Sequence, residues 1–263
     1  MIGEHIKELS RDLATEYNVL DGIVSELDEQ QWKTVTSFYG WNIKDEITHL
    51  AYYDESAGLS VSDPDAFVLF FNELKQNPGN WNEKTFAPYF DLSIADLLAW
   101  WRIERKKLLT VLESKNPTDR LPWFGPTMGA KSLAASRIME VWAHGQDVCD
   151  ALNIQRPATD RLRHIAHLGV ITFGWSFSNR KLDVPDTSIR VELKSPNNEN
   201  WECGPKDSEE KVQGSAEGFC QIVTQRRNIA DTDIITTGKI ATQWMQIAQA
   251  FAGPPEEGPV PTR

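Results

Sequence analysis

The first part of the chain places hydrophobic residues at spacings of three and four, which is the period of an amphipathic helix. Within residues 4–28 this stripe is formed by Leu9, Leu13, Tyr17, Leu20, Val24 and Leu27. Similar patterns predict further helices at about 43–57, 66–74, 93–113 and 130–152. Four long helices joined by shorter connections are typical of an antiparallel bundle, with residues 60–92 as an insertion or lid.

The pattern changes after Pro157, where segments that alternate apolar and polar residues follow one another. We predict strands at 188–193, 201–203, 210–212 and 233–236, and helices at 159–176, 216–226 and 239–250. This mixture indicates a small α+β domain. The predicted organisation is therefore a helical bundle over 1–157, an α+β domain over 158–252 and a flexible tail, rich in Pro and Gly, over 253–263.

Composition and charge exclude several classes of function. The 263 residues carry a net charge of −11 and contain no long basic run, so nucleic acid and anionic membranes are poor partners. No apolar stretch approaches the roughly 20 residues of a membrane-spanning helix. The three cysteines lack the spacing of a metal motif or a disulfide framework, which favours a cytoplasmic protein. We expect a monomer or a homodimer that acts on a small molecule.

Candidate chemistry is concentrated in the predicted helix at 130–152. Glu140 and His144 are four residues apart, so a carboxylate and an imidazole share one helix face. Arg137 and Asp147 lie on the same face, which is unusual for a bundle helix. The stripe is either exposed to solvent, with Glu140 and His144 as an ordinary surface pair, or it lines a polar cavity. In a cavity, Asp147 is a candidate for acid–base catalysis or for holding a ligand.

His49 is the third candidate ligand, and alone it carries little information. A single histidine in a helical apolar context is more often a core residue. Asp45, four residues earlier, could accept a hydrogen bond from the His49 ring or could be a charge that favours the first turn of the helix. Two imidazoles and one carboxylate would suit a divalent metal with positions left open for chemistry.

The segment Gly40–Leu50, with the sequence GWNIKDEITHL, resembles the GW-x-x-(R/K)-D-x-x-x-H-L segment of the DinB-like metal-binding bundles. Nearly the whole chain resembles the mycothiol-dependent maleylpyruvate isomerase family, and residues 214–228 and 244–255 resemble an uncharacterised metal-binding subgroup within it. The resemblance implies a DinB-like four-helix bundle followed by a small sterol-carrier-like α+β domain. It also implies that His49, Glu140 and His144 bind a divalent metal, usually zinc.

The resemblance further suggests a class of reaction. The isomerase that names the family adds a low-molecular-weight thiol to an activated alkene, allows rotation about the resulting single bond and expels the thiol. In the family, an arginine of the second domain reaches the cleft between the domains and grips a carboxylate. Here Arg226 or Arg227 would take this role, with Arg226 preferred, or would instead stabilise the C-terminus of its own helix. Arg137 is a similar candidate, or forms a salt bridge with Asp147 or Glu140.

We therefore predict a metal-dependent isomerase, lyase or thiol transferase that binds its substrate in the cleft between the two domains. The metal is zinc by resemblance, while iron, nickel, cobalt and copper also suit the ligands. Ten tryptophans, together with Phe124, could supply aromatic pocket walls or simply pack; Trp41, Trp123 and Trp142 are the nearest candidates. They favour a ring-containing substrate, from secondary metabolism. The alternative is a non-catalytic protein with a structural metal, or with a metal-free cavity that shapes a ligand.

Overall fold

The computed structural model describes residues 6–76 and 85–262. The chain forms two compact units, Met1–Gln155 and Arg156–Arg263. This division lies two residues before the predicted boundary. Residues 77–84 of the insertion or lid predicted at 60–92 fall outside the described residues. Among the described helices, none is long and apolar enough to cross a membrane.

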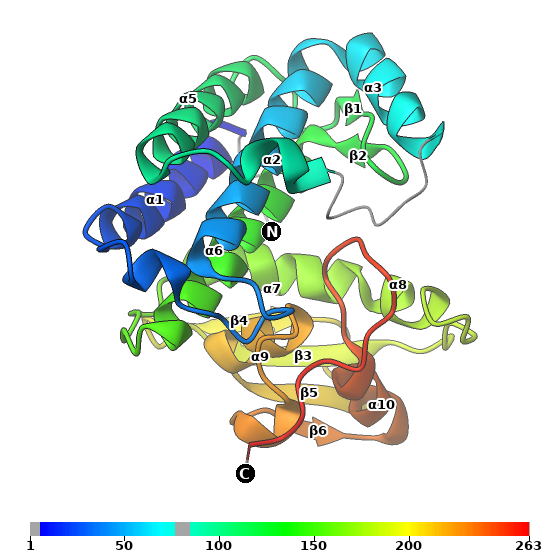
Figure 1. Cartoon of the computed structure of the whole chain (residues 1–263). Coiled ribbons are helices and arrows are strands. Elements are labelled where there is room, and N and C mark those ends of the chain that lie inside the picture. Colours follow the sequence, from blue (N-terminus) through cyan, green and yellow to red (C-terminus); the bar gives the residue numbers. More distant parts are fainter. Residues whose placement is uncertain (1–5, 77–84, 263) are drawn as a thin grey trace. The chain divides into compact units, whose positions relative to one another are not determined.

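The first unit is a bundle of four long helices, α1 (Ile6–Val24), α2 (Ile43–Ser62), α5 (Ile94–Leu112) and α6 (Ala130–Ala151). Helix α1 packs against α5 and α6, and α2 packs against the same two helices (Figure 1). The predicted apolar stripe of α1 is fully or almost fully buried from Leu9 to Val24. The DinB-like bundle that the sequence predicts is confirmed.

Shorter elements complete the first unit. Helix α3 (Pro64–Gln76) packs on α2, and the turns η1 (Gln31–Lys33) and η2 (Ala87–Tyr89) lie in the connections. A two-stranded hairpin, β1 (Arg120–Leu121) and β2 (Met128–Gly129), frames the aromatic loop before α6. The sequence does not predict this hairpin, because two residues per strand are too few to show alternation.

A single buried carboxylate joins all four bundle helices. Asp54 of α2 accepts a hydrogen bond of 2.6 Å from the Tyr17 hydroxyl of α1 and one of 3.1 Å from the Trp101 indole of α5. Arg137 of α6 forms an ion pair with the same carboxylate, with Nε 2.9 Å from Oδ1. Burial raises the pKa of Tyr17, and the Asp54 carboxylate adds to the effect, so the phenol keeps its proton and donates it. Burying a charge requires such pairing.

The second unit is built on a four-stranded sheet in the order β4-β3-β5-β6, confirming the α+β class. Its strands are β3 (Ile189–Lys194), β4 (Asn200–Cys203), β5 (Glu210–Ser215) and β6 (Ile235–Thr237). Strand β3 pairs antiparallel with β4 and parallel with β5, and β6 runs antiparallel to β5. Val191, Leu193 and Val212 alternate with polar residues and are buried.

Helices cover the buried side of this sheet (Figure 1). Helix α9 (Ala216–Val223) packs on β3 and β5, and α10 (Lys239–Ile247) packs on β5 and β6. Helix α7 (Leu162–Ile171) lies on α9, and α8 (Phe173–Ser178) lies on α10. A Cβ atom at Gly169 would be 2.8 Å from the Phe219 ring, so a glycine is needed where α7 meets α9.

Several boundaries differ from the prediction. The helix predicted at 159–176 is two helices, because Thr172 leaves helical geometry between α7 and α8. The helix predicted at 216–226 ends at Val223, and Gln225 then takes the left-handed conformation with φ of 58°.

The segment 253–262 has no helix or strand, as expected of a loop, but hydrogen bonds attach it to the second unit. Asn228 donates to the Pro259 carbonyl at 2.9 Å, and the Thr262 amide donates to Asp231 at 2.9 Å.

Substituting Asp54 tests the role of the shared carboxylate. We expect Asp54→Ala to lower the free energy of unfolding by about 3–5 kcal/mol, because Arg137 would be left buried without its counter-ion. Tyr17→Phe removes one neutral hydrogen-bond donor and should lower the free energy of unfolding by about 1–3 kcal/mol. Urea unfolding measures both, with Asp91→Ala as a control at an exposed position. A loss at Asp54 no larger than that at Asp91 would contradict this role.

The cysteines give a second test of the fold. Cys149 and Cys220 are buried, whereas Cys203 is half-buried, and burial raises the pKa of the Cys220 thiol. A thiol with a raised pKa and no access reacts slowly. An aromatic disulfide reagent should therefore react rapidly with Cys203 alone in the native protein and with all three thiols in denaturant. The rapid phase should disappear in Cys203→Ser; a rapid phase that persists there would show that a buried cysteine is accessible.

Candidate metal centre

Helices α2 and α6 bring the three predicted metal ligands together. His49 Nε2 and His144 Nε2 each lie 3.3 Å from the same oxygen, Oε2 of Glu140. The three ligand atoms all lie within 4.8 Å of one another. His144 is buried, with 2% of its side chain exposed, whereas His49 and Glu140 keep 15% and 23%. The group is therefore closed on the His144 side and accessible on the side of the other two residues.

The other nitrogen of His144 is held by a residue that the sequence analysis did not select. His144 Nδ1 lies 2.6 Å from Oε2 of Glu46, and the second oxygen of Glu46 accepts a hydrogen bond of 2.6 Å from the Thr36 hydroxyl. Glu46 is fully buried. A carboxylate oxygen accepts the hydrogen bond at this distance, so Nδ1 of His144 carries a proton. Nε2 of the same ring faces Glu140.

The protonation states of His49 and Glu140 suit a metal. Burial, followed by the neighbouring imidazole of His144, lowers the pKa of His49 to about 4, so this ring is neutral at pH 7. Burial would raise the pKa of Glu140, but the two imidazoles outweigh it and lower this pKa well below its ordinary value. A neutral imidazole at His49 and an ionised carboxylate at Glu140 are ligand forms that bind divalent cations.

The contacts between α2 and α6 follow a regular antiparallel register. Arg137 contacts Asp54, Glu140 contacts His49, and His144 contacts Glu46. Steps of three and four residues along α6 are thus matched by steps of five and three residues backwards along α2. The candidate metal ligands and the buried ion pair lie on one continuous seam between two helices.

A tight loop before α2 presents two aromatic rings to the imidazoles. Tyr39 and Gly40 both have positive φ, 51° and 71°, and the Trp41 amide donates to the Phe38 carbonyl at 3.0 Å. Phe38 contacts the His144 ring edge-on at 5.0 Å between centroids, while Trp41 lies parallel to it at 6.3 Å. The loop therefore restricts the orientation of the His144 ring.

The aromatic candidates from the sequence differ in position. Trp41 is beside both imidazoles, 5.4 Å from the His49 ring. Trp123 stacks on Phe67 and Phe124 packs edge-on against Tyr53, which is itself 4.6 Å from His49. Trp123 and Phe124 therefore lie one aromatic ring further from His49 than Trp41 does. Trp142 is a buried residue of α6. Phe86, which the sequence analysis did not select, lies 5.9 Å from the His49 ring.

Arg137 is close to the candidate centre but is held by a partner that the sequence analysis did not consider. Its ion pair is with Asp54, not with Asp147 or Glu140. Burial alone would lower the pKa of Arg137, but Asp54 raises it, so the guanidinium stays charged. One of its terminal nitrogens is buried without a hydrogen-bond partner. A catalytic role for Arg137 remains a prediction.

Asp147 and Asp45 take different positions from each other. Asp147 is buried, and its Oδ2 lies 3.8 Å from Nδ1 of His144, the nitrogen that faces away from Glu140. This favours a role in holding His144, while proton transfer by Asp147 remains a prediction.

Asp45 accepts from the Asn42 amide at 3.0 Å in a capping box at the start of α2. Its alternative as a first-turn residue is therefore correct, and the acidic partner of a site histidine is Glu46.

Arg226 belongs to the second unit, three residues beyond the end of α9. Its NH1 donates to the Thr224 carbonyl at 2.8 Å, and its backbone amide donates to the Gln221 carbonyl at 2.8 Å. The side chain thus satisfies a carbonyl at the helix C-terminus, as the alternative interpretation expects. Binding of a substrate carboxylate by Arg226 or Arg227 remains a prediction.

Three residues of this seam and loop were not predicted: Glu46, Asp54 and Thr36. The sequence contains a signal for the first two. Glu46 and Asp54 occur within the apolar stripe of α2. Glu46 comes three residues after Ile43 and four before Leu50, and Asp54 comes four residues after Leu50 and three before Ala57. An acidic residue at such a core position must find a buried partner. Thr36 gave no signal, since its contact depends on the loop conformation.

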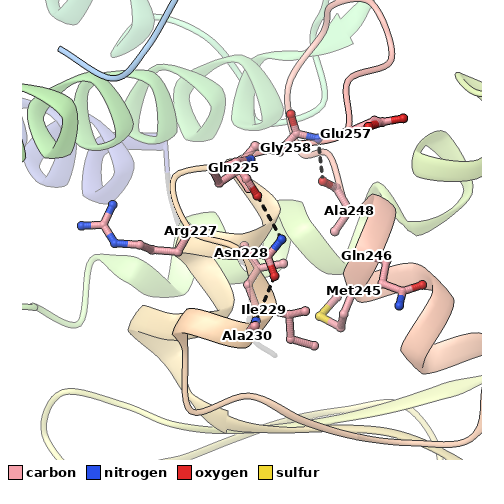
Figure 2. Close-up of a pocket in the computed structure, with 12 residues that line it drawn as sticks. Gln225, Arg227, Asn228, Ile229, Ala230, Met245, Gln246, Ala248, Glu257 and Gly258 are labelled. Carbon is pink, nitrogen blue, oxygen red and sulfur yellow. Dashed lines mark hydrogen bonds between the residues drawn. The ribbon is translucent and has the colours of Figure 1, made fainter. Parts of the chain in front are cut away.

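The second unit contains a separate pocket of about 330 Å³, shown in Figure 2. Ile222, Ile229 and Met245 form its apolar part, and the C-terminal segment closes one side at Gly258 and Pro259. Figure 2 shows the Arg227 side chain turned outwards. The amides at the rim already bond to this unit: Gln225 Nε2 donates to the Ala248 carbonyl at 3.2 Å, and Asn228 Oδ1 accepts from the Ala230 amide at 3.0 Å. They are engaged in holding the pocket together.

Comparisons with known proteins agree with this architecture. Two uncharacterized proteins of Mycobacterium tuberculosis, from the strains CDC 1551 / Oshkosh and ATCC 25618 / H37Rv, are each 42% identical over 247 residues, covering 94% of this chain and 96% of theirs. Crystal structures of the mycothiol-dependent maleylpyruvate isomerase and of a variant of it share 16% and 17% identity. They have TM-scores of 0.56 and 0.57, and each alignment covers 88% of this chain and 92% of the other.

At this low identity the crystal structures establish the fold alone. Membership of a family rests on sequence. Residues 13–149, just over half of the chain, match the mycothiol maleylpyruvate isomerase N-terminal domain, and the match includes α2 and the candidate ligands on α6. The chain belongs to the mycothiol maleylpyruvate isomerase family.

Proposed function

We propose that this protein is a metal-dependent isomerase-type enzyme in which His49, Glu140 and His144 hold one divalent cation and a low-molecular-weight thiol acts as cosubstrate. Zinc is the first choice of metal, since two imidazoles and one carboxylate with open positions are typical of catalytic zinc. The substrate would be a small, unsaturated organic acid, by analogy with the maleylpyruvate in the family name. Lyase and thiol-transferase reactions are the close alternatives.

One observation carries this proposal. Glu46 is hydrogen-bonded to Nδ1 of His144 at 2.6 Å, and Nε2 of the same ring lies 3.3 Å from the Glu140 carboxylate. A ring nitrogen and a carboxylate oxygen at this distance need a proton or a cation between them. The neutral His49 ring has its Nε2 at the same distance from the same oxygen. A cation bound by all three residues would satisfy every one of these atoms.

The charges of the surrounding residues support a cation as well. Among the described residues, four carboxylates, those of Glu46, Asp54, Glu140 and Asp147, share this seam with the guanidinium of Arg137. Burying excess negative charge is costly in a medium of low dielectric constant. A divalent cation would reduce that excess, which favours the metal-binding interpretation over an empty polar cavity.

The residues around the candidate centre also suit catalysis better than a purely structural metal. A closed structural zinc site has four protein ligands, whereas three residues converge here and two of them are partly exposed. When bound, the cation would supply Lewis-acid chemistry, by lowering the pKa of a thiol or by polarising a carbonyl oxygen. Trp41 and Tyr53 lie beside His49 and would restrict water and contact an apolar part of the substrate.

Metal analysis tests the first part of the proposal. Purified protein loaded with zinc should retain about one ion per chain, and His49→Ala, Glu140→Ala and His144→Ala should each lose most of it, since three ligands are needed to hold the ion. His167→Ala is the matched control, because His167 is an exposed histidine of α7 outside the cluster. Circular dichroism checks that each variant is folded. Absence of bound metal in the parent protein would refute the proposal.

A thiol balance tests the reaction. With mycothiol and maleylpyruvate, proton NMR should show conversion of the cis to the trans isomer, with the free thiol concentration unchanged at completion. Transfer would instead consume one thiol for each substrate molecule, and a lyase would release two products. We expect His144→Ala to lower kcat/KM by at least about 100-fold, more than the loss typical of a residue that only supports a ligand.

The outcomes separate the two functions considered. Stoichiometric metal without turnover of any thiol and electrophile pair would favour the alternative, a non-catalytic metal- or ligand-binding protein. Turnover that is equal in the parent protein and in a metal-free, chelator-treated sample would show that the cation has no role in the reaction.

A further inference from the structure

We infer that Glu46 is a positioning residue for the metal centre: with Thr36, it fixes the tautomer and the orientation of His144, so that the two imidazole ligands are unequal. His144 would be the anchored ligand and His49 the adaptable one. This inference rests on the proposed metal site, and it concerns residues that do not themselves bind the cation.

The geometry of Glu46 supports hydrogen bonding in preference to metal binding. Its Oε2 lies 2.6 Å from His144 Nδ1, which is the length of a charge-assisted hydrogen bond and leaves no room for a cation between the two atoms. Its Oε1 is engaged by the Thr36 hydroxyl, also at 2.6 Å. Both oxygens therefore have donors, and the carboxylate is held from two sides.

Thr36 connects this carboxylate to the aromatic loop. The Thr36 amide donates to the Trp41 carbonyl at 2.7 Å, and the Phe38 amide donates to the Thr36 hydroxyl at 3.3 Å. The loop that carries Phe38 and Trp41 against the His144 ring is thus tied to the residue that holds the ring nitrogen. Hydrogen bond and ring packing restrict the same imidazole, so its Nε2 is preorganised toward Glu140.

His49 lacks an equivalent support. Its Nδ1 is buried and has no hydrogen-bond partner among the described residues, and the ring is held by contacts with Trp41, Tyr53 and Phe86. It is also the more exposed imidazole, at 15% against 2%. A ring without a fixed second nitrogen can rotate or shift at lower cost, so changes in coordination would occur on the His49 side.

The second group of potential ligands, Glu46, His144 and Asp147, gives a rival interpretation. A second cation bound there would need Nδ1 of His144 deprotonated, making His144 a bridge between two metals. The 2.6 Å contact and the bond from Thr36 argue against it, and the experiment below includes it as an outcome.

Cobalt binding to Glu46 variants tests the inference. Co²⁺ is used as the probe because its visible absorption reports the geometry and strength of its ligands. In competition with a chelator, Glu46→Gln should weaken Co²⁺ binding by about 10–100-fold and shift the absorption bands, the range known for residues that support a metal-bound histidine. Thr36→Val, which leaves Glu46 in place, should produce a smaller change in the same direction.

Asp45→Asn is the matched control, since it removes the same charge one residue away and affects only the helix cap. The affinity of Asp45→Asn for Co²⁺ should stay within about twofold of that of the parent protein, because a helix cap stabilises the helix and does not contact the metal ligands. Equal affinity and an unchanged spectrum in Glu46→Gln would overturn the inference. Two cobalt ions per chain, one of them lost in Glu46→Gln, would overturn it in favour of the bridged pair.

A measurement on the unaltered protein remains decisive if a variant does not fold. With zinc bound, nitrogen-15 NMR of His144 should show the proton on Nδ1 and the metal on Nε2. The opposite tautomer would overturn the inference while leaving the proposed metal centre intact. A parent protein that binds neither zinc nor cobalt would instead remove the proposed function itself, so the two failures are distinguishable.

Discussion

The first unit depends on one constraint. Asp54 carries a charge in the middle of a helical bundle, so its carboxylate oxygens need hydrogen-bond donors or a counter-ion. A buried carboxylate without partners would cost several kcal/mol. Asp54 meets this requirement by accepting from Tyr17, Trp101 and Arg137, one residue from each of the other long helices. Apolar contacts tolerate small shifts, whereas these directional bonds do not, so the carboxylate sets the relative positions of all four helices.

The register set by Asp54 determines the candidate centre. Once Arg137 is opposite Asp54, the antiparallel run of α2 and α6 places Glu140 opposite His49 and His144 opposite Glu46. A slip of one turn would separate these pairs by about 5.4 Å and leave several buried charges unpaired. Burying the charged groups of this polar seam therefore contributes little to stability. Their pairing instead specifies a single arrangement of α2 and α6. A metal site with three ligands on two helices needs that specificity.

The sequence was sufficient for the bundle and for the ligands on α6, because helical periodicity and i, i+4 spacing are local properties. His49 needed the family resemblance, since its partners are about ninety residues away. Assigning Asp45 as a possible partner of His49 followed the same local logic, and capping by Asn42 took precedence. Glu46 and Asp54 could have been found as acidic residues in an apolar stripe. Thr36 and the short hairpin could not, because they depend on loop geometry. The break at Thr172 likewise depends on packing in the second unit.

The unequal surroundings of the two imidazoles have a consequence for recognition. Glu46, Thr36 and the Phe38 ring lie on the His144 side of the centre, so among the described residues of the first unit the side of His49 and Glu140 is the more accessible one. The rings nearest that side are Trp41 and Tyr53. Aromatic faces select for apolar or planar groups and offer few hydrogen bonds. Polar recognition would then come from the proposed cation, from the terminal nitrogen of Arg137 that has no hydrogen-bond partner or from residues elsewhere in the chain. Substrate selectivity within this fold would therefore change most easily through the aromatic residues, without altering the candidate metal ligands.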